Sequence, residues 1–383
     1  MIAAPASAQT YSILYSFTGG TDGGWPFAGM AYDADGNLYG TTGFGGDLTC
    51  VPPLGCGTVF KLDPTGKLTT LHTFNGADGE LPSGPLLRDS AGNLFGTTQL
   101  GGPFGAGTLF RVDAAGTFTL LHSFKPAKGM TPYAGVIEDS RGFLYGATYN
   151  GGAFQDGLIY ELNPANGQFK TLHSFAGFGN ADGQAPYGNL IFDGKGGLIG
   201  TTSYGGGGCD CGSVFTIDKD GNETLLYAFH NDDGAHPFAP VIRDNAGNLY
   251  GTTGNGGDFS CDPLGCGVIF KLTPAGAITV LQRFSGSDGA DPNSGLLRDS
   301  QGIFYGMTQQ GGNKGCPSNP KGCGVIYKFD SSRTITVLHA FSNGNGEGFN
   351  PEANLAFDGT GSLIGTANEG GAFGFGIVFR LTP

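Results

Sequence analysis

Residues 36–43 read Gly-Asn-Leu-Tyr-Gly-Thr-Thr-Gly, and residues 247–254 repeat the same letters. Related versions of the Gly-Thr-Thr part begin at seven places along the chain: Gly40, Gly96, Gly146, Gly200, Gly251, Gly306 and Gly365. A second segment that ends in Leu/Val-x-x-Phe, and a third centred on an aromatic residue, also occur seven times each. Short apolar runs separated by glycine-rich turns are typical of β-strands, and their fixed repetition indicates a repeat architecture.

A proline, an aspartate and a glycine set the frame of every repeat. The repeat prolines are Pro26, Pro82, Pro132, Pro186, Pro237, Pro292 and Pro351. An Asp follows seven residues after each proline, and a Gly follows seven residues after each Asp. We interpret each repeat as a four-stranded antiparallel meander. Strand A follows the proline, strand B contains Gly-Thr-Thr, strand C contains the central aromatic residue and strand D ends in Phe.

The two ends of the sequence carry incomplete repeats that complement each other. The chain opens with a lone D strand at residues 11–17 and closes with an A-B-C set that ends at Leu381. Pairing of these ends would close a ring and remove exposed sheet edges. The sequence therefore predicts an all-β, seven-bladed β-propeller over residues 11–383. The expected repeats span about 26–74, 82–124, 132–175, 186–229, 237–284, 292–341, and 351–383 with 11–17.

Composition excludes two classes of function. The formal net charge is −13 and no cluster of Lys or Arg occurs, whereas nucleic-acid binding needs gathered cations. No run of 18 apolar residues is present, so we expect no transmembrane segment. Glycine is abundant, at 74 of 383 residues, but its regular spacing indicates turns rather than disorder.

The cysteines and the N-terminus both indicate export. Eight cysteines form four close pairs, which we expect to be disulfides: Cys50–Cys56, Cys209–Cys211, Cys261–Cys266 and Cys316–Cys323. The Cys-x₂-Cys spacing of common zinc modules is absent, and disulfides persist in oxidising compartments. Ala6-Ser7-Ala8 resembles a signal-peptidase site, so residues 1–10 are interpreted as a signal-peptide remnant or a disordered terminus. We expect a secreted bacterial protein, periplasmic or extracellular.

Length variation points to one face of the ring. The interval from strand B to strand C runs from 14 to 21 residues, and every cysteine pair lies in one of the longer intervals. The D–A interval also varies, whereas the A–B turn does not. In a meander the B–C and D–A connections lie at the same end of the blade. Variable loops on a rigid scaffold usually carry binding, so this face is the predicted functional face.

Residues beside the repeat proline and after Gly-Thr-Thr are expected at the mouth of the channel. The candidate ligand-binding residues are Trp25, Phe27, Tyr133, Tyr149, Tyr187, Tyr204, Phe238, Asn293 and Gln309. Aromatic faces mixed with amides suit sugar rings, which present apolar C–H faces and hydroxyl edges. The same mixture also occurs in the loops of propellers with other roles.

A weaker set of residues could support catalysis. His236, Asp291 and Glu352 flank repeat prolines near Trp25, and a His with two carboxylates can perform acid–base chemistry on a polysaccharide. Tyr133 and Tyr187 could serve a lyase-like proton transfer.

Two other recurrent residue types are better explained as structural. The other histidines, except His230, share one D-strand position in different repeats and would be spread around the rim: His72, His122, His173 and His339. Acids in Asp-Gly-x-x-Pro suit tight turns, and their calcium interpretation is weaker because a repeat supplies at most one acid and Lys128 replaces it in one repeat. No cofactor and no metal site are therefore predicted, although Ca²⁺ stays an alternative.

The unit Tyr-Gly-Thr-Thr-x-x-Gly-Gly, followed by Gly-Thr-Val-Phe-Lys-Leu and Leu-His-Ser-Phe, resembles the tandem repeat called GloVer. Residues 39–74 and 250–284 show it most fully. The resemblance covers nearly the whole chain from Tyr11 and implies an exported bacterial repeat protein of the kind that carries varied C-terminal anchors. It implies no particular activity, and no catalytic residue is carried over from it.

Three functions follow from these observations. The first is an extracellular propeller that binds a glycan or another cell-surface component through its B–C and D–A loops. The second is a polysaccharide lyase or glycoside hydrolase at the channel mouth, and the third is a structural surface or filament subunit. The sequence favours binding and leaves the ligand and the oligomeric state undetermined.

Overall fold

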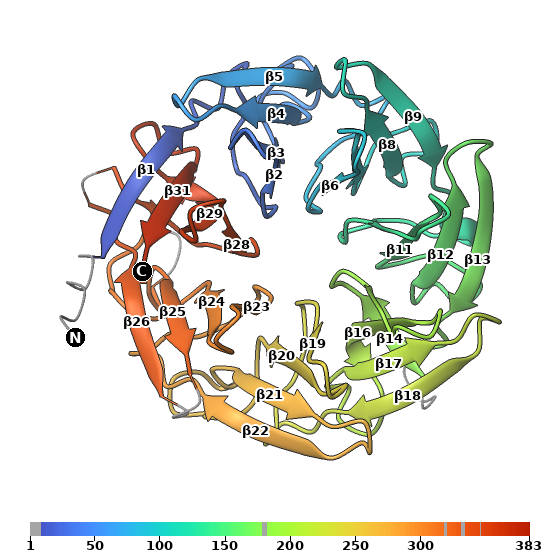
Figure 1. Cartoon of the computed structure of the whole chain (residues 1–383), viewed down its shortest axis with the longest axis vertical. Coiled ribbons are helices and arrows are strands. Elements are labelled where there is room, and N and C mark those ends of the chain that lie inside the picture. The colour runs from blue at the N-terminus through green and yellow to red at the C-terminus, as the bar shows by residue number, and fades with distance from the viewer. Residues whose placement is uncertain (1–8, 178–181, 318–319, 331–333, 345) are drawn as a thin grey trace, which may run out of the picture.

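A computed structural model describes residues 9–177, 182–317, 320–330, 334–344 and 346–383. The expected signal-peptide remnant therefore lies mostly outside the described residues. Seven antiparallel sheets stand around a central axis, as Figure 1 shows, and the predicted seven-bladed β-propeller is confirmed. In the described part of the chain the only helical element is a 3₁₀ turn, η1 (Pro126–Lys128). No helix there is long and apolar enough to cross a membrane.

The first four blades follow the predicted A-B-C-D order. Blade 1 contains β2 (Ala31–Tyr32), β3 (Leu38–Thr42), β4 (Thr58–Leu62) and β5 (Leu68–Thr73). Blade 2 contains β6 (Leu87–Arg88), β7 (Leu94–Thr98), β8 (Thr108–Val112) and β9 (Phe118–Ser123). Blade 3 contains β10 (Ile137–Glu138), β11 (Leu144–Thr148), β12 (Leu158–Asn163) and β13 (Gln168–Ser174). Blade 4 contains β15 (Ile191–Phe192), β16 (Leu198–Gly205), β17 (Ser213–Ile217) and β18 (Glu223–Ala228), with β14 (Gly183–Pro186) also paired to β16.

The last three blades complete the circle. Blade 5 contains β19 (Ile242–Arg243), β20 (Leu249–Thr253), β21 (Val268–Leu272) and β22 (Ile278–Arg283). Blade 6 contains β23 (Leu297–Arg298), β24 (Phe304–Thr308), β25 (Val325–Phe329) and β26 (Ile335–Ala340). Blade 7 contains β28 (Ala356–Phe357), β29 (Leu363–Ala367), β31 (Ile377–Thr382) and, from the other end of the chain, β1 (Thr10–Ser16). β27 (Gly348–Phe349) and β30 (Glu369–Gly370) pair with each other in a separate two-stranded ribbon. It joins the D–A and B–C connections of blade 7.

The ring closes where the sequence predicts. β1 is the outer strand of blade 7 and pairs antiparallel with β31, from Thr10 opposite Thr382 to Ser16 opposite Ile377. Figure 1 shows the blue first strand beside the red last strand. Closure gives β31 a hydrogen-bonding partner on each side and leaves no open gap in the circle.

Repeated aromatic pairs join neighbouring blades. The strand-C aromatic of each blade packs edge-to-face against the Phe that follows strand D of the preceding blade, with ring centroids 5.0–5.5 Å apart. In blade 2, for example, Phe110 contacts Phe74, and both are fully buried. A Cβ on Gly96 of strand B would lie 2.5 Å from the Phe110 ring, which explains the glycine of Gly-Thr-Thr.

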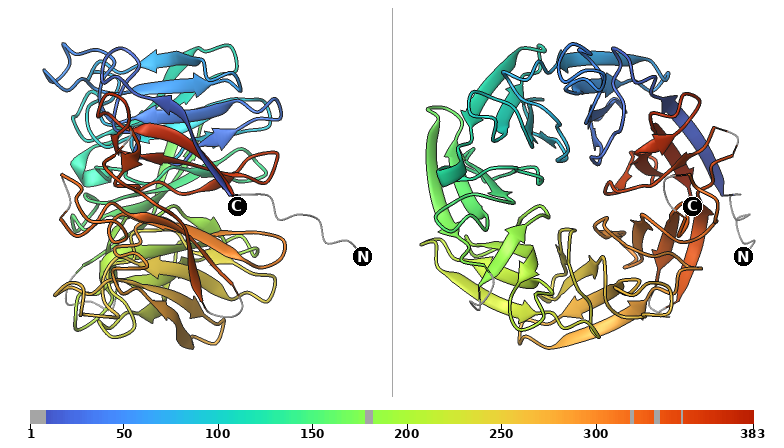
Figure 2. Two further views of the ribbon diagram at one scale, coloured as in Figure 1. Left: turned by 90° about the vertical axis from the view of Figure 1, so that its left-hand side faces the viewer. Right: turned by 180° about the vertical axis from the view of Figure 1, so that it is seen from behind.

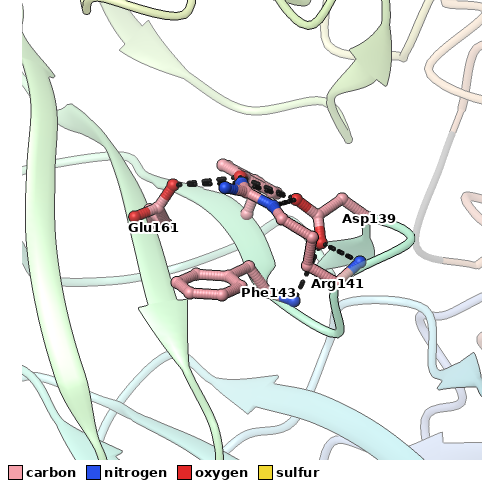
Figure 3. A network of polar contacts seen from close by, with 5 residues as sticks. Asp139, Arg141, Phe143 and Glu161 are labelled. Atoms are coloured by element: carbon pink, nitrogen blue, oxygen red, sulfur yellow. Dashed lines mark hydrogen bonds and ion pairs between the residues drawn. The ribbon is translucent and has the colours of Figure 1, made fainter.

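The Asp residues of the A–B turns are structural. Each accepts backbone hydrogen bonds from residues two and four positions later, as Asp89 does from Ala91 and Asn93. In blade 3 the Arg141 guanidinium also pairs with Asp139 at 2.7 Å and lies 4.0 Å from Glu161, over the Phe143 ring (Figure 3). Because this network belongs to an A–B turn, it lies on the face opposite the long loops.

The acids of Asp-Gly-x-x-Pro are turn residues, and they pair with the D strands. Asp78 lies 3.0 Å from the Nε2 of His72, and Asp182 lies 3.3 Å from that of His173. Tyr15 and Tyr227 donate to the corresponding acids of their own D–A connections. The D-strand histidines are thus distributed around the ring, each in its own blade, and do not form a shared site.

All four predicted disulfides are present, and all lie in B–C connections. Each B–C loop is bonded to the preceding D–A connection, as Gly24 is to Phe44 in blade 1. The two kinds of connection therefore share one face, called here the loop face, which shows irregular loops on the left of the side view in Figure 2. Four disulfides indicate an oxidising, non-cytoplasmic compartment.

Candidate functional site

The residue before each repeat proline has an unusual backbone conformation that shapes the channel mouth. All seven have φ between 54° and 60°, although none is glycine: Trp25, Leu81, Thr131, Ala185, His236, Asp291 and Asn350. The N–H of each donates to a carbonyl of the preceding blade, as His236 does to Cys211. A non-glycine residue with such a φ is in a strained conformation. In most repeats, backbone hydrogen bonds to the B–C loops of the preceding blade and of its own blade hold this residue in place.

The residue after each proline faces the axis. All seven are half-buried between a buried proline and a buried small residue. Together they line one cavity of about 450 Å³ at the loop-face end of the channel. The seven are Phe27, Ser83, Tyr133, Tyr187, Phe238, Asn293 and Glu352. This one repeat position therefore contributes a residue from every blade to the wall of the central cavity.

Blades 3, 4 and 5 give this cavity an aromatic side. The rings of Tyr133 and Tyr187 are stacked with centroids 4.6 Å apart, and Tyr187 meets Phe238 edge-on at 5.4 Å. Tyr149 packs edge-on against Tyr133 from behind. Burial raises the pKa of Tyr133, and burial with the nearby Tyr204 and Tyr133 raises the pKa of Tyr149 to about 12. These phenols are therefore neutral hydrogen-bond donors at physiological pH.

Blades 6 and 7 give the cavity a polar side. Asn293 donates to Gln309 at 3.0 Å, and Gln309 in turn donates to the carboxylate of Glu352. Burial is the main cause that raises the pKa of Glu352 to about 7, and the nearby carboxylates Asp291 and Glu369 add to the shift. On the opposite side, Gln99 donates to Ser83 at 2.5 Å. No Lys, Arg or His lines this cavity in the described part of the chain.

Backbone N–H groups of one blade donate hydrogen bonds to asparagine side chains of the next blade around this cavity. Gly135 donates to the side chain of Asn189 in the next blade at 2.9 Å, and Gly295 donates to that of Asn354 at 2.5 Å. A Cβ on Gly135 would lie 2.3 Å from the carbonyl oxygen of Pro85. Asn189 and Asn354 also line the cavity, three residues after their prolines. The sequence argument did not select them, although their constant place in the repeat frame could have done so.

Several predicted site residues do not line the central cavity. Trp25 is packed edge-on between Phe44 and Phe375. The Nδ1 of His236 lies 2.9 Å from Asn255, and its ring packs against Tyr204. The residue before the proline thus pairs with a B–C residue of its own blade.

Asp291 follows the same pattern in blade 6. Gln310 donates to its carboxylate at 3.0 Å, and burial raises its pKa to about 6. It lines a second, neighbouring cavity rather than the central one. Of the five catalytic candidates, the structure brings Glu352, Tyr133 and Tyr187 together and places His236 and Asp291 outside that group. In the described residues, no group of three or more His, Cys, Asp or Glu could hold a metal ion.

Comparison with known proteins identifies the repeat and the fold. The family model of the Gloeobacter/Verrucomicrobia repeat matches residues 2–138, 115–316 and 262–383. None of the curated proteins matches the chain. Among solved structures, an oligogalacturonate lyase from Vibrio parahaemolyticus aligns with a TM-score of 0.57 at 12% identity, covering 98% of this chain and 94% of that one. An oligogalacturonate lyase in complex with manganese aligns with a TM-score of 0.59 at 14% identity, covering 97% and 92%. At these identities the likeness shows the fold alone.

Proposed function

The chain belongs to the Gloeobacter/Verrucomicrobia repeat family, and from that premise we propose that it is an exported propeller that binds a neutral saccharide in its central cavity. The observation that carries the proposal is the mixed chemistry of the cavity wall. Blades 3–5 contribute the aromatic rings of Tyr133, Tyr187 and Phe238, blade 1 adds Phe27, and blades 6 and 7 contribute Asn293 and Glu352. Sugar rings need both, because their C–H faces stack on aromatic rings while their hydroxyls bond to amides and carboxylates.

The charge and size of the cavity support a neutral ligand. Among the described residues that line the cavity, Glu352 is the only carboxylate and no cation is present. An anionic sugar would meet an uncompensated negative potential in a chain of net charge −13. The volume of about 450 Å³ lies within the range of small-molecule sites. We therefore favour the end or an internal segment of a neutral glycan over a uronate chain.

Calorimetric titration with cellohexaose, xylohexaose and mannohexaose tests the proposal. We expect at least one to bind, and we expect Tyr187→Ala to weaken that binding by at least about tenfold, because the central stacking surface is lost. Tyr32→Ala is the matched control, since Tyr32 is 49% exposed on β2 next to the A–B turn. Binding that Tyr187→Ala leaves unchanged, or no binding in the whole series, would contradict the proposal.

A polysaccharide lyase or glycoside hydrolase is the second candidate, and Glu352 is the observation that favours it. With a pKa near 7, this carboxyl could donate or accept a proton at neutral pH beside Tyr133 and Tyr187. Most glycoside hydrolases need two carboxyl groups, about 5–9.5 Å apart. Asp291 is not a lining residue of this cavity, so binding is the better supported function.

Product analysis separates the two candidates. Incubation of the same hexasaccharides with the protein should leave them intact, as chromatography of the mixture would show. Release of shorter sugars by the wild type and not by Glu352→Gln would establish the enzyme.

A further inference from the structure

A second cavity lies beside the central one on the loop face. It has a volume of about 350 Å³ and lies between the B–C loops of blades 5 and 6, and we call it the seam cavity. The disulfide-bearing segment of blade 5 lines one side, and Gln310 and Lys321 of blade 6 line the other. Phe238 and Asn293 line both cavities. The two cavities therefore share part of their walls, and a ligand in either one could touch these two side chains.

The seam cavity repeats the mixed chemistry of the central cavity. Leu264 is 61% exposed and offers an apolar surface at its edge. Asn255 and Gln310 provide amides that are held in place by bonds to His236 and Asp291. Lys321 forms an ion pair with Asp262 across the two loops, and Asp291 is the one further carboxyl group among the described residues that line the cavity, so an anionic ligand is disfavoured. This arrangement again suits a ligand with hydroxyl groups and no net charge.

We propose that the central cavity and the seam cavity form one site for a neutral oligosaccharide, which runs from the axis over Phe238 and Asn293 to the gap between blades 5 and 6. The inference rests on the proposed saccharide binding and adds its length and direction. A monosaccharide or disaccharide would occupy the central cavity alone. A longer chain would gain contacts with Leu264 and the amides of the second cavity.

The repeat supplies a matched control for this proposal. Leu264 lies in Cys-Asp-Pro-Leu-Gly-Cys of blade 5, and Leu54 lies in the corresponding Val-Pro-Pro-Leu-Gly-Cys of blade 1. Both leucines are exposed and lie one residue before the glycine that precedes a disulfide cysteine. Only Leu264 of the two lines the seam cavity. Leu264→Ala and Leu54→Ala therefore change similar loops and differ in their place relative to the proposed path.

The experiment compares dissociation constants of disaccharides and hexasaccharides of the cello-, xylo- and manno- series for the wild type and both variants. We expect the preferred hexasaccharide to bind at least about tenfold more tightly than its disaccharide. Leu264→Ala should weaken hexasaccharide binding by about fivefold and leave disaccharide binding unchanged, and Leu54→Ala should change neither. A second variant, Gln310→Ala, should act like Leu264→Ala, with circular dichroism confirming that each variant is folded.

The outcomes distinguish the two claims. Equal affinity for disaccharide and hexasaccharide, with Leu264→Ala and Gln310→Ala without effect, would overturn the extended site and leave binding in the central cavity intact. Loss of hexasaccharide binding in Leu54→Ala as well would show that the leucines act through loop structure, and would also overturn it. If no saccharide binds to the wild type, both the proposed function and the extended site are wrong.

Discussion

Lys128 occupies the place where the other six repeats carry an acid, so the D–A connection that follows His122 offers it no such acid. His122 lies at the D-strand position whose counterparts His72 and His173 face Asp78 and Asp182. It stacks on Phe169 with ring centroids 4.3 Å apart, and its Nε2 has no hydrogen-bond partner in the described structure. Burial, with a smaller effect of Lys125, lowers the pKa of His122 to about 4.

We predict that His122 titrates near pH 4 in the folded protein, as its imidazole Cε1–H resonance would show by NMR. Lys128→Asp should raise that pKa by about one unit or more, because it restores the acid of the other repeats. An unchanged titration in the Lys128→Asp variant would contradict the pairing rule inferred from the other blades.

The same histidine should make stability depend on pH. The unfolded state binds its proton near pH 6.5 and the folded state near pH 4, so folding stability falls as pH drops through this window. Allowing for partial solvent exposure, the loss is roughly 2 kcal/mol. Urea unfolding at pH 7 and pH 4 should show a smaller loss of folding stability for His122→Gln than for the wild type. Glutamine is chosen because blade 5 carries Gln282 at the same D-strand position. An equal loss in both proteins would contradict the account.

Glu352 has the opposite dependence. Its folded pKa of about 7 exceeds the ordinary value of 4.5, so the folded state holds the proton more tightly and stability falls as pH rises through this window. Glu352→Gln should therefore be about 2 kcal/mol more stable than the wild type at pH 8 and nearly equal to it at pH 4. Urea unfolding at the two pH values measures this, and a variant less stable at pH 8 would show that Glu352 is not held in an unfavourable environment.

Between elements, the first Thr of Gly-Thr-Thr connects neighbouring blades in some repeats and not in others. Thr97 donates to the carbonyl of Ala134 in the next blade at 2.8 Å, and Thr201 and Thr252 make the equivalent bond. The hydroxyl of Thr41, in the same position of blade 1, is buried without a partner in the described structure. Thr41 can therefore serve as the control for the contribution of the Thr97 hydrogen bond to stability.

We predict that Thr97→Val lowers the free energy of unfolding by about 1–2 kcal/mol, because it leaves a buried carbonyl without its donor. Thr41→Val should change it by less than about 0.5 kcal/mol, or stabilise the protein, because no bond is lost. Chemical unfolding of the two variants tests the difference. Equal losses would show that the interblade bond contributes nothing specific.

Element-scale reasoning from the sequence succeeded where the period of the repeat is regular. The proline, aspartate and glycine frame predicted the strands, their order and the loops that share a face. The sequence frame could not show that the side chains before and after the proline have different surroundings, because side chains two residues apart in a strand point to the same face. The positive φ of His236 and its six counterparts breaks that alternation, and the side chains of His236 and Asp291 bond to residues of the B–C loops. Non-glycine residues with such φ cannot be recognised from sequence alone.

For the whole molecule, closure of the ring by β1 is the main structural claim. Thr10 and Thr382 are opposite each other in the register of β1 and β31. We predict that Thr10→Cys with Thr382→Cys forms an intramolecular disulfide on oxidation, which peptide mass spectrometry would identify. We expect this bond to raise the free energy of unfolding by about 4 kcal/mol, the upper end of the typical range for disulfides. Failure of the two cysteines to join would contradict the closure.

The position of the site follows from that closure. A closed ring of seven blades brings one residue of each repeat to the axis, and only the complete set forms the cavity of Tyr133, Tyr187, Phe238, Asn293 and Glu352. The sequence predicted these residues as neighbours because their repeat position is constant. The seam cavity could not be predicted, since it depends on how two disulfide-bearing loops of different length lie against each other.

The most direct test of the account is a crystal structure of the protein with the hexasaccharide that binds best in titration. We predict sugar density in the central cavity, with one ring stacked on Tyr187 and the chain continuing over Phe238 on the loop face. Density on the A–B and C–D turn face or along the outer strands, with the central cavity free of sugar, would contradict it.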